Sequence, residues 1–248
     1  MVMKIGFERE MFVINEEGKP QDTVRLKLPS DNCGYLCESR GEPHTDIFLA
    51  IASMLSIEET IISKINSLNL HPLLTNRMKF DRKTELRYIK RYAKGTDNER
   101  NLYGFIKGRK YGNKTAGLHI HFGQTENVWL LDRYGHMNLV DLITKHMDIP
   151  TIIRKLDIEF KEEIKLSKRQ KGLYEIKQHG FEYRSLPCNI NMIDVGNRLY
   201  KILIDEDDSS VYNFEIETSR SSQFLKDITY DMYSSNRKSN RSYTSYIS

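Results

Sequence analysis

Three short stretches of the chain each place two ionisable residues two positions apart. The pairs are Glu8 and Glu10 in GFEREMFV, His119 and His121 in AGLHIHFG, and Glu182 and Arg184 in GFEYRSLP. Residues i and i+2 of a β-strand point to the same face, so each strand would carry a polar pair on one side and apolar residues on the other. Carboxylates, imidazoles and a guanidinium on neighbouring strands suit hard divalent cations and the phosphate groups that such cations carry. The sequence therefore predicts a metal-dependent site for phosphate chemistry on one face of a sheet.

No single pair decides this interpretation. A lone histidine is more often a hydrogen-bonded core or surface residue than a metal ligand, and exposed strands often carry charged pairs. Gly117 and Gly123 bracket the histidine pair, and glycine in a strand lets a ligand or another backbone approach closely. The joint occurrence of the three pairs favours one common site. The stretch GRKYGNKT is not a P-loop, because its glycine and lysine spacing differs and a strand follows where a helix should begin.

Strands are expected over much of the first 40 residues. The pattern over 6–28 predicts a strand, a turn and a second strand from residue 21, with Glu8 and Glu10 on one face of the first strand. A further strand is expected within SDNCGYLCESRGEP, where Glu38 and Arg40 share a side.

Helices and further strands are expected in the rest of the chain. Residues 47–68 have the apolar spacing of a helix that Thr45 or Asp46 would cap. Residues 70–112 are polar, basic and aromatic and predict a long functional loop with short helical pieces. The later expectations are helices at 138–147 and 151–166, a strand over 174–186 and a helix from near Val195. This order predicts an α+β fold in a single domain over residues 1–233, followed by a disordered polar tail over 234–248.

Composition excludes several classes of protein. The chain has 248 residues, of which 39% are hydrophobic and 29% charged, as is typical of a soluble globular domain. No apolar run approaches the roughly 18 residues of a membrane span, and charges from Lys4 onwards interrupt any signal peptide, so a cytoplasmic location without membrane contact is expected. Cys33, Cys37 and Cys188 lack the spacing of a zinc site or a disulfide framework, which predicts reduced thiols.

Charge is unevenly distributed along the chain. The formal net charge of +4 does not by itself indicate nucleic-acid binding. Between Arg77 and Lys114, however, 13 Lys and Arg residues stand against four Asp and Glu, and Lys168, Arg169 and Lys171 form a second basic cluster. These clusters are either solvated basic faces or a rim that attracts anionic substrates.

Four blocks of the sequence resemble one enzyme family. They are GFEREM, SDNCGYLCESRGEP, AGLHIHFG and KGLYEIKQHGFEYRSLP, in that order. They are similar to the carboxylate-amine ligases of the glutamine synthetase and glutamate-cysteine ligase superfamily, and most of all to its compact phage-encoded branch. The resemblance extends from about Gly6 to Asn189. It implies an antiparallel sheet with helices packed on one face, a glutamine synthetase-like catalytic domain, in the cytoplasm of a cell or of a phage host.

The same resemblance assigns roles to individual residues. It implies ATP and Mg²⁺ or Mn²⁺ as cofactors, and small-molecule or peptide carboxylates and amines as substrates. The implied metal ligands are Glu8, Glu10, Glu38, His119 and Glu182, with Asp31 and Glu42 as alternatives to Glu38. His121 would face the nucleotide phosphates, Arg184 and Arg40 would be the catalytic cations, and Arg169 and Lys171 would be further phosphate contacts.

The implied reaction is ATP-dependent formation of an amide bond. A carboxylate is a poor electrophile, so transfer of the γ-phosphoryl group would first make an acyl phosphate, from which the amine displaces phosphate. Two alternatives stay open: a phosphotransferase that phosphorylates a carboxylate or guanidino group at the same site, and a non-catalytic module that binds nucleic acid through residues 77–114. The +4 net charge makes nucleic acid the less favoured partner.

Overall fold

The computed structural model describes residues 3–30, 34–92, 113–124, 149–177 and 180–204. Within these residues an antiparallel sheet runs in the order β2-β1-β6-β8-β7. The short strand β3 pairs with residues 12–14 of β1. Its strands are β1 (Met3–Ile14), β2 (Leu36–Arg40), β3 (His71–Leu73), β6 (Gly117–Gln124), β7 (Tyr174–Lys177) and β8 (Gly180–Pro187). A separate ribbon pairs β4 (Arg77–Lys79) with β5 (Asn113–Thr115).

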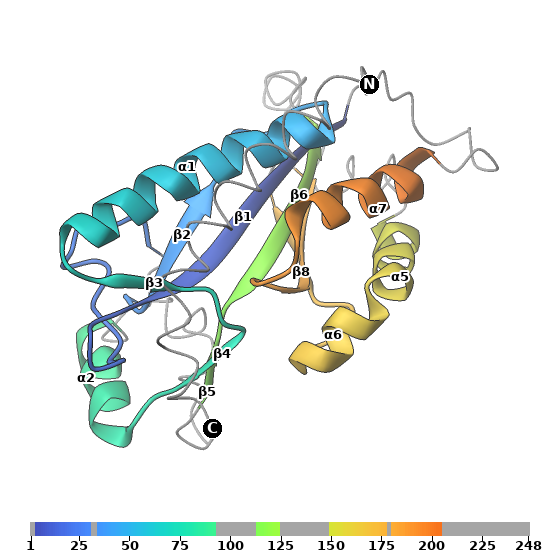
Figure 1. The fold of residues 1–248 in the computed structure, drawn as a ribbon. Helices are drawn as coiled ribbons and strands as arrows, with labels where there is room; N and C mark the ends of the chain where they lie inside the picture. The colour runs from blue at the N-terminus through green and yellow to red at the C-terminus, as the bar shows by residue number, and fades with distance from the viewer. Residues whose placement is uncertain (1–2, 31–33, 93–112, 125–148, 178–179, 205–248) are drawn as a thin grey trace, which may run out of the picture.

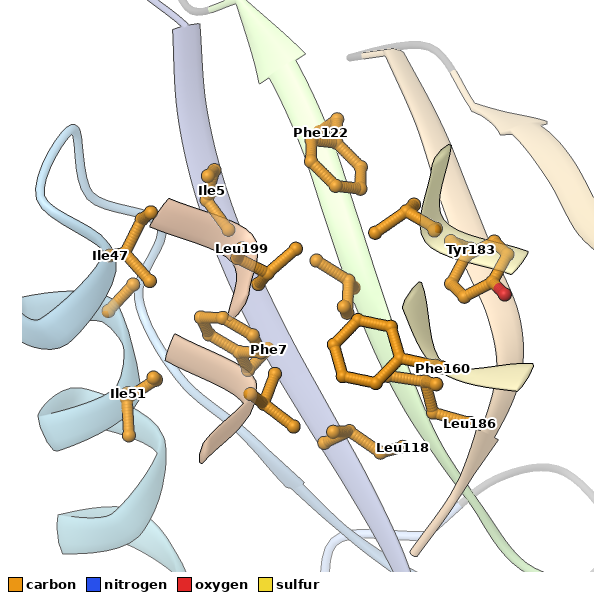
Figure 2. Packing of buried hydrophobic residues seen from close by; sticks show 14 of the residues in the cluster. Ile5, Phe7, Ile47, Ile51, Leu118, Phe122, Phe160, Tyr183, Leu186 and Leu199 are labelled. Carbon is orange, nitrogen blue, oxygen red and sulfur yellow. The ribbon is translucent and has the colours of Figure 1, made fainter. Parts of the chain in front are cut away.

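Four helices cover one face of this sheet. They are α1 (Ile47–Ser67), α5 (Ile149–Glu159), α6 (Lys161–Ser167) and α7 (Met192–Ile204), and α1 runs along β1 (Figure 1). Alternating residues of the central strands, such as Phe7, Phe122 and Tyr183, point towards these helices and are fully buried among them (Figure 2). The α+β class, the antiparallel sheet and the helices on one face are therefore confirmed.

A second apolar cluster lies at the β2 and β3 end of the sheet. Phe12 of β1 contacts Tyr35 and Phe80, and Tyr88 of α2 (Arg82–Tyr92) completes the group. Phe12 follows Glu8 and Glu10 at the same two-residue spacing, so this cluster closes one end of the strand face that carries the acidic pair. The predicted long loop over 70–112 thus contains β3, β4 and α2 in its described part.

The predicted helix over 47–68 is confirmed as α1, and Asp46 is its cap. The Asp46 side chain accepts hydrogen bonds from the backbone N–H groups of Phe48 and Leu49 at 2.7 and 3.1 Å. These are donors that a helix cannot satisfy within its own first turn. The predicted helix over 151–166 is divided at Phe160 into α5 and α6, and the last helix begins at Met192.

The predicted strand from residue 21 to residue 28 is wrong. This segment folds into consecutive turns, in which the Asp22 carbonyl accepts from Leu26 N–H and the Asp22 side chain accepts from Arg25 N–H. Lys27 adopts a left-handed backbone conformation with φ of 54°. A capping aspartate followed by closely spaced turn hydrogen bonds competes with strand pairing. The helix predicted over 138–147, the end of the domain at residue 233 and the polar tail all lie outside the described residues.

Candidate metal centre

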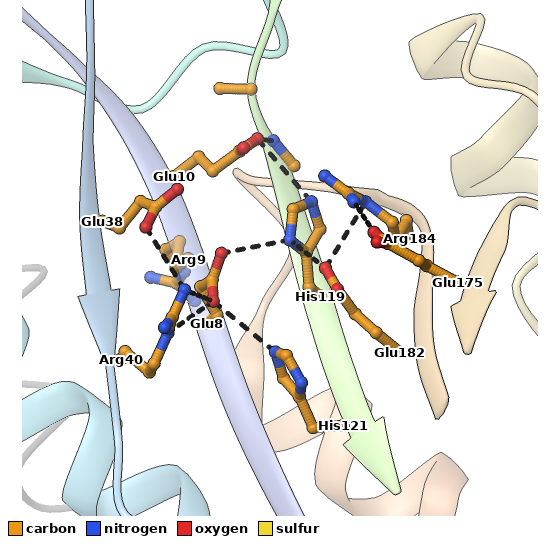
Figure 3. Close-up of polar contacts among 12 residues, drawn as sticks. Glu8, Arg9, Glu10, Glu38, Arg40, His119, His121, Glu175, Glu182 and Arg184 are labelled. Carbon is orange, nitrogen blue, oxygen red and sulfur yellow. Dashed lines mark hydrogen bonds and ion pairs between the residues drawn. The ribbon is translucent and has the colours of Figure 1, made fainter. Parts of the chain in front are cut away.

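Strand register brings the three polar pairs onto the sheet face opposite the four helices. Across the β1–β6 pair Glu8 lies opposite His119, and across β6–β8 His121 lies opposite Glu182. On the other side of β1, Arg40 of β2 also lies opposite Glu8. Side chains of directly opposed residues project to the same face, so these groups converge from four strands on a small area (Figure 3).

Glu8, His119 and Glu182 form the group of possible metal ligands found within the described part of the chain. One ligand atom from each lies within 4.8 Å of the others, and all three residues are buried. His119 Nδ1 is 2.8 Å from Glu182 Oε1 and 3.3 Å from Glu8 Oε1. Neighbouring ligands of an octahedral Mg²⁺ ion, with bonds of about 2.1 Å, lie about 3 Å apart. The donor set therefore fits one small divalent cation, and its imidazole admits Mn²⁺ readily.

In the metal-free protein the neighbouring carboxylates favour the protonated form of His119. Burial lowers the pKa of His119, but the charge of Glu10 and hydrogen bonds to Glu182 and Glu8 outweigh burial and raise it to about 9. Burial raises the pKa of Glu182, yet its hydrogen bond with His119 and the surrounding positive charges lower it to about 2. The pKa of Glu8 is held well below its usual range for the same reasons. A cation that displaced this proton would meet the same three donors.

Glu10 and Glu38, both predicted metal ligands, lie beside this group rather than in it. Glu10 Oε2 is 3.7 Å from His119 Nε2 and accepts a 2.6 Å hydrogen bond from the backbone N–H of Gly117. Glu38 lies opposite Glu10 in the sheet, with its Oε2 3.4 Å from Arg40 Nη2. Of the two alternatives to Glu38, Glu42 is exposed and Asp31 lies outside the described residues. The geometry thus favours Glu38 over Glu42.

Three basic side chains contact the carboxylates of the group. Arg40 Nη2 is 2.6 Å from Glu8 Oε2, and this side chain is 65% exposed. Lys177 Nζ is 2.9 Å from Glu182 Oε2, and Arg184 Nε is 3.4 Å from Glu182 Oε1. Positive charge therefore lies on both the β2 and the β7 side of the possible cation position.

His121 lies nearer to solvent than His119 does. Its Nε2 is 3.5 Å from Glu8 Oε2, and its side chain is 17% exposed against 2% for His119. Both histidines project from β6 on the face opposite the core. The buried His119 imidazole thus belongs to the group of possible metal ligands, and the more exposed His121 imidazole lies where a ligand from solvent could contact it.

Glu175 and Lys177 of β7 were not predicted as site residues. Glu175 lies directly opposite Glu182, and like charges in that relation repel each other. Lys177 Nζ lies 3.0 Å from Glu175 Oε2, and Arg184 Nη1 lies 2.6 Å from the same oxygen, which offsets the repulsion. The spacing of Glu175 and Lys177 in YEIK repeats the i, i+2 pattern of the other strands, and this signal could have identified them.

Two predicted phosphate contacts occupy different positions. Arg169 is partly buried and donates to the backbone carbonyls of Ala116 and Arg184 at 3.0 and 2.7 Å. Burial lowers its pKa, while the charge of Glu10 opposes that effect. Lys171, in contrast, is an exposed residue of the loop between α6 and β7.

A buried ion pair supports β1 from beneath the site. Arg9, between the two glutamates, points to the helix face, where its Nη1 lies 3.1 Å from Glu58 Oε1 of α1. Its Nη2 donates to the Ile190 carbonyl at 3.4 Å, and Ser39 Oγ lies 3.3 Å from both the Arg9 carbonyl and Glu58 Oε2, to either of which its hydroxyl can donate. These contacts join β1, β2 and α1 at the residue that separates Glu8 from Glu10.

Neither described cysteine is suited to nucleophilic catalysis. Cys37 and Cys188 are buried free thiols, and burial raises the pKa of each to about 12. At neutral pH both stay protonated, and the thiol is a far weaker nucleophile than the thiolate. Neither of these two thiols is therefore an activated nucleophile.

Comparison with protein-family models, with curated proteins and with solved structures found no match. None of the helices in the described ranges is long and apolar enough to span a membrane.

Proposed function

We propose that this chain is an ATP-dependent carboxylate-amine ligase that uses Mg²⁺ or Mn²⁺. The observation that carries the proposal is the convergence of Glu8, His119 and Glu182 into a buried three-donor group with cationic side chains on two sides. The four sequence blocks that resemble such ligases supply these same residues. The glutamine synthetase-like assignment of the fold belongs to this proposal as well.

The three donors would hold one divalent cation, with Glu10 and Glu38 close enough to orient its water or to bind a further cation. The cation would neutralise phosphate charge and polarise the γ-phosphoryl group during transfer. For this to occur His119 must lose the proton whose binding the neighbouring carboxylates favour. Metal binding is therefore coupled to proton release.

The basic side chains would stabilise the anions that meet at this face. In the first step a carboxylate oxygen of the substrate attacks the γ-phosphorus of ATP and ADP leaves, which gives an acyl phosphate. Arg184 and Lys177 on one side and Arg40 on the other can offset the charge of the phosphoryl oxygens, and His121 can donate a hydrogen bond at the rim. All four contact carboxylates of the site in the metal-free protein, so a bound cation would release them towards an anionic ligand.

In the second step the amine nitrogen attacks the acyl carbon, the C–O bond to phosphate breaks, and the amine gives up a proton. No covalent intermediate with the protein is required, which agrees with the inert state of the buried cysteines. A phosphotransferase would use the same first step and stop there. The same geometry supports that second candidate, and only the product distinguishes the two.

The test is product analysis with Mg·ATP and pooled amino acids, small carboxylates and amines. We expect release of ADP and phosphate together with a product one water lighter than its two substrates, detected by mass spectrometry. Glu182→Gln should abolish turnover, whereas Glu162→Gln, an exposed residue of α6, should not change it. A phosphorylated carboxylate or guanidino compound would establish the phosphotransferase instead. Absence of Mg·ATP binding by the intact protein would contradict both candidates.

A further inference from the structure

Strand β8 contains a β-bulge opposite His119, one of the three possible metal ligands. Leu118 of β6 pairs with Leu186 of β8, but Ile120 pairs with Tyr183, so two residues of β8 stand opposite the single residue His119. The extra residue lets Glu182 and Arg184 share the site face while Leu186 still reaches the core. The direction of the Arg184 side chain therefore depends on how this bulge is held.

Hydrogen bonds from the loop between α6 and β7 hold the bulge in place. Arg184 N–H donates to the Leu173 carbonyl at 2.8 Å, and Leu173 N–H donates to Ser185 Oγ at 2.9 Å. Arg169, just after the left-handed residue that ends α6, adds a third connection, because its Nη2 donates to the Arg184 carbonyl at 2.7 Å. Its Nη1 donates to the Ala116 carbonyl at 3.0 Å. One guanidinium thus joins the beginning of β6 to the bulge of β8.

Gly117 makes this connection possible. A Cβ atom at residue 117 would lie 2.5 Å from Arg169 Nη2 and 2.8 Å from its Cζ, which is closer than real Cβ contacts come. The backbone N–H of the same glycine donates to Glu10 Oε2 at 2.6 Å. The close approach that this glycine permits is therefore used by a side chain of the protein itself, next to a candidate metal ligand.

We propose that Arg169 is a positioning residue that acts through Arg184, and that it does not contact the nucleotide phosphates. Both of its terminal nitrogens have backbone acceptors, and these acceptors belong to the residues next to Gly117 and at the bulge. A planar guanidinium spans two such carbonyls, whereas a lysine ammonium is a single point donor. The consequence for nucleotide binding rests on the proposed function, but the role in holding the bulge does not.

The first test is a double-mutant cycle on Mg·ATP affinity with Arg169→Gln, Arg184→Gln and the double variant. If Arg169 acts through Arg184, each single change weakens binding and the double variant binds within about twofold of Arg184→Gln alone. Arg169→Lys should resemble Arg169→Gln in Mg·ATP affinity. Additive losses in the double variant, or wild-type nucleotide affinity in Arg169→Lys, would overturn the proposal, because they indicate direct or purely electrostatic contact with phosphate.

The second test is hydrogen exchange at the Leu173 and Arg184 amides in the nucleotide-free protein. Arg169→Gln should increase both exchange rates at least about tenfold, since a charge-assisted hydrogen bond that holds the bulge is lost. Arg154→Gln removes an exposed arginine of α5 and should leave these rates unchanged. Unchanged exchange in Arg169→Gln overturns the proposal even if nucleotide binds. If the intact protein binds no Mg·ATP, the proposed function fails and the exchange data alone decide the role of Arg169.

Discussion

The buried pair of Arg9 and Glu58 allows a quantitative test of how β1 is supported beneath the site. The two side chains are 1% and 3% exposed, and their closest atoms lie 3.1 Å apart. Removal of one partner alone, by Glu58→Leu, would leave a guanidinium buried without its counter-charge, at a cost of about 3–5 kcal/mol. That is a large fraction of the roughly 5–15 kcal/mol that stabilises a typical domain.

Replacement of both partners has a different expected outcome. In Arg9→Met with Glu58→Leu neither charge of the pair stays buried, and the losses include the hydrogen bonds to the Ile190 carbonyl and from Ser39, each worth about 1 kcal/mol. The relief of the two desolvation penalties offsets that loss, so we expect stability within about 2 kcal/mol of the unchanged protein and a coupling energy of at least about 2 kcal/mol.

The assay is urea unfolding of the chelator-treated protein, with equal slopes among the variants as the check on two-state behaviour. Since Arg9 points away from the face that carries Glu8 and Glu10, the double variant should also bind Mn²⁺ as the unchanged protein does. A Glu58→Leu variant within 1 kcal/mol of the unchanged protein would refute the reasoning, as would a double variant whose loss equals the sum of the single losses.

Three further outcomes are expected. Because the pKa of His119 is about 9 in the folded, metal-free protein and about 6.5 when unfolded, its contribution to stability should be complete below pH 6.5 and lost as the pH rises through 9. Unfolding in chelator should show this loss in the unchanged protein and not in His119→Gln. Asp46→Ala should cost about 1 kcal/mol of stability by the same assay, since it removes the cap of α1. Under the proposed function, Arg184→Lys should lower kcat/KM for ATP more than about tenfold, because a lysine ammonium cannot replace a guanidinium that binds a phosphoryl group through two nitrogens. An unaltered value would exclude such a contact.

The local part of the site was predictable from the sequence because strand periodicity is local. Two-residue spacing sufficed to place Glu8 with Glu10 and His119 with His121 on one face, and helical spacing with a capping aspartate sufficed for α1. These features depend on residues only a few positions apart. The same holds for the α+β class, since it follows from the order of such elements.

The remaining features depend on contacts between distant segments. Nothing near Arg9 in the sequence indicates Glu58, 49 residues away, as its partner, and the pattern that suits a surface charge suits a buried ion pair equally. The resemblance implies a phosphate contact for Arg169, which stays a prediction, whereas nothing in the sequence indicates that its guanidinium donates to the backbone carbonyls of Ala116 and Arg184. The turns after Pro20 were missed because alternating residues there resemble a strand, while the Asp22 cap favours turns.

The most direct test of the central claim is anomalous diffraction from crystals of the protein grown with Mn²⁺. A metal centre formed by Glu8, His119 and Glu182 predicts a manganese peak about 2.0–2.6 Å from Glu8 Oε1, His119 Nδ1 and Glu182 Oε1, and its loss in Glu182→Gln. The claim would be contradicted if crystals grown at saturating Mn²⁺ showed no peak there and the distance from His119 Nδ1 to Glu182 Oε1 were still 2.8 Å.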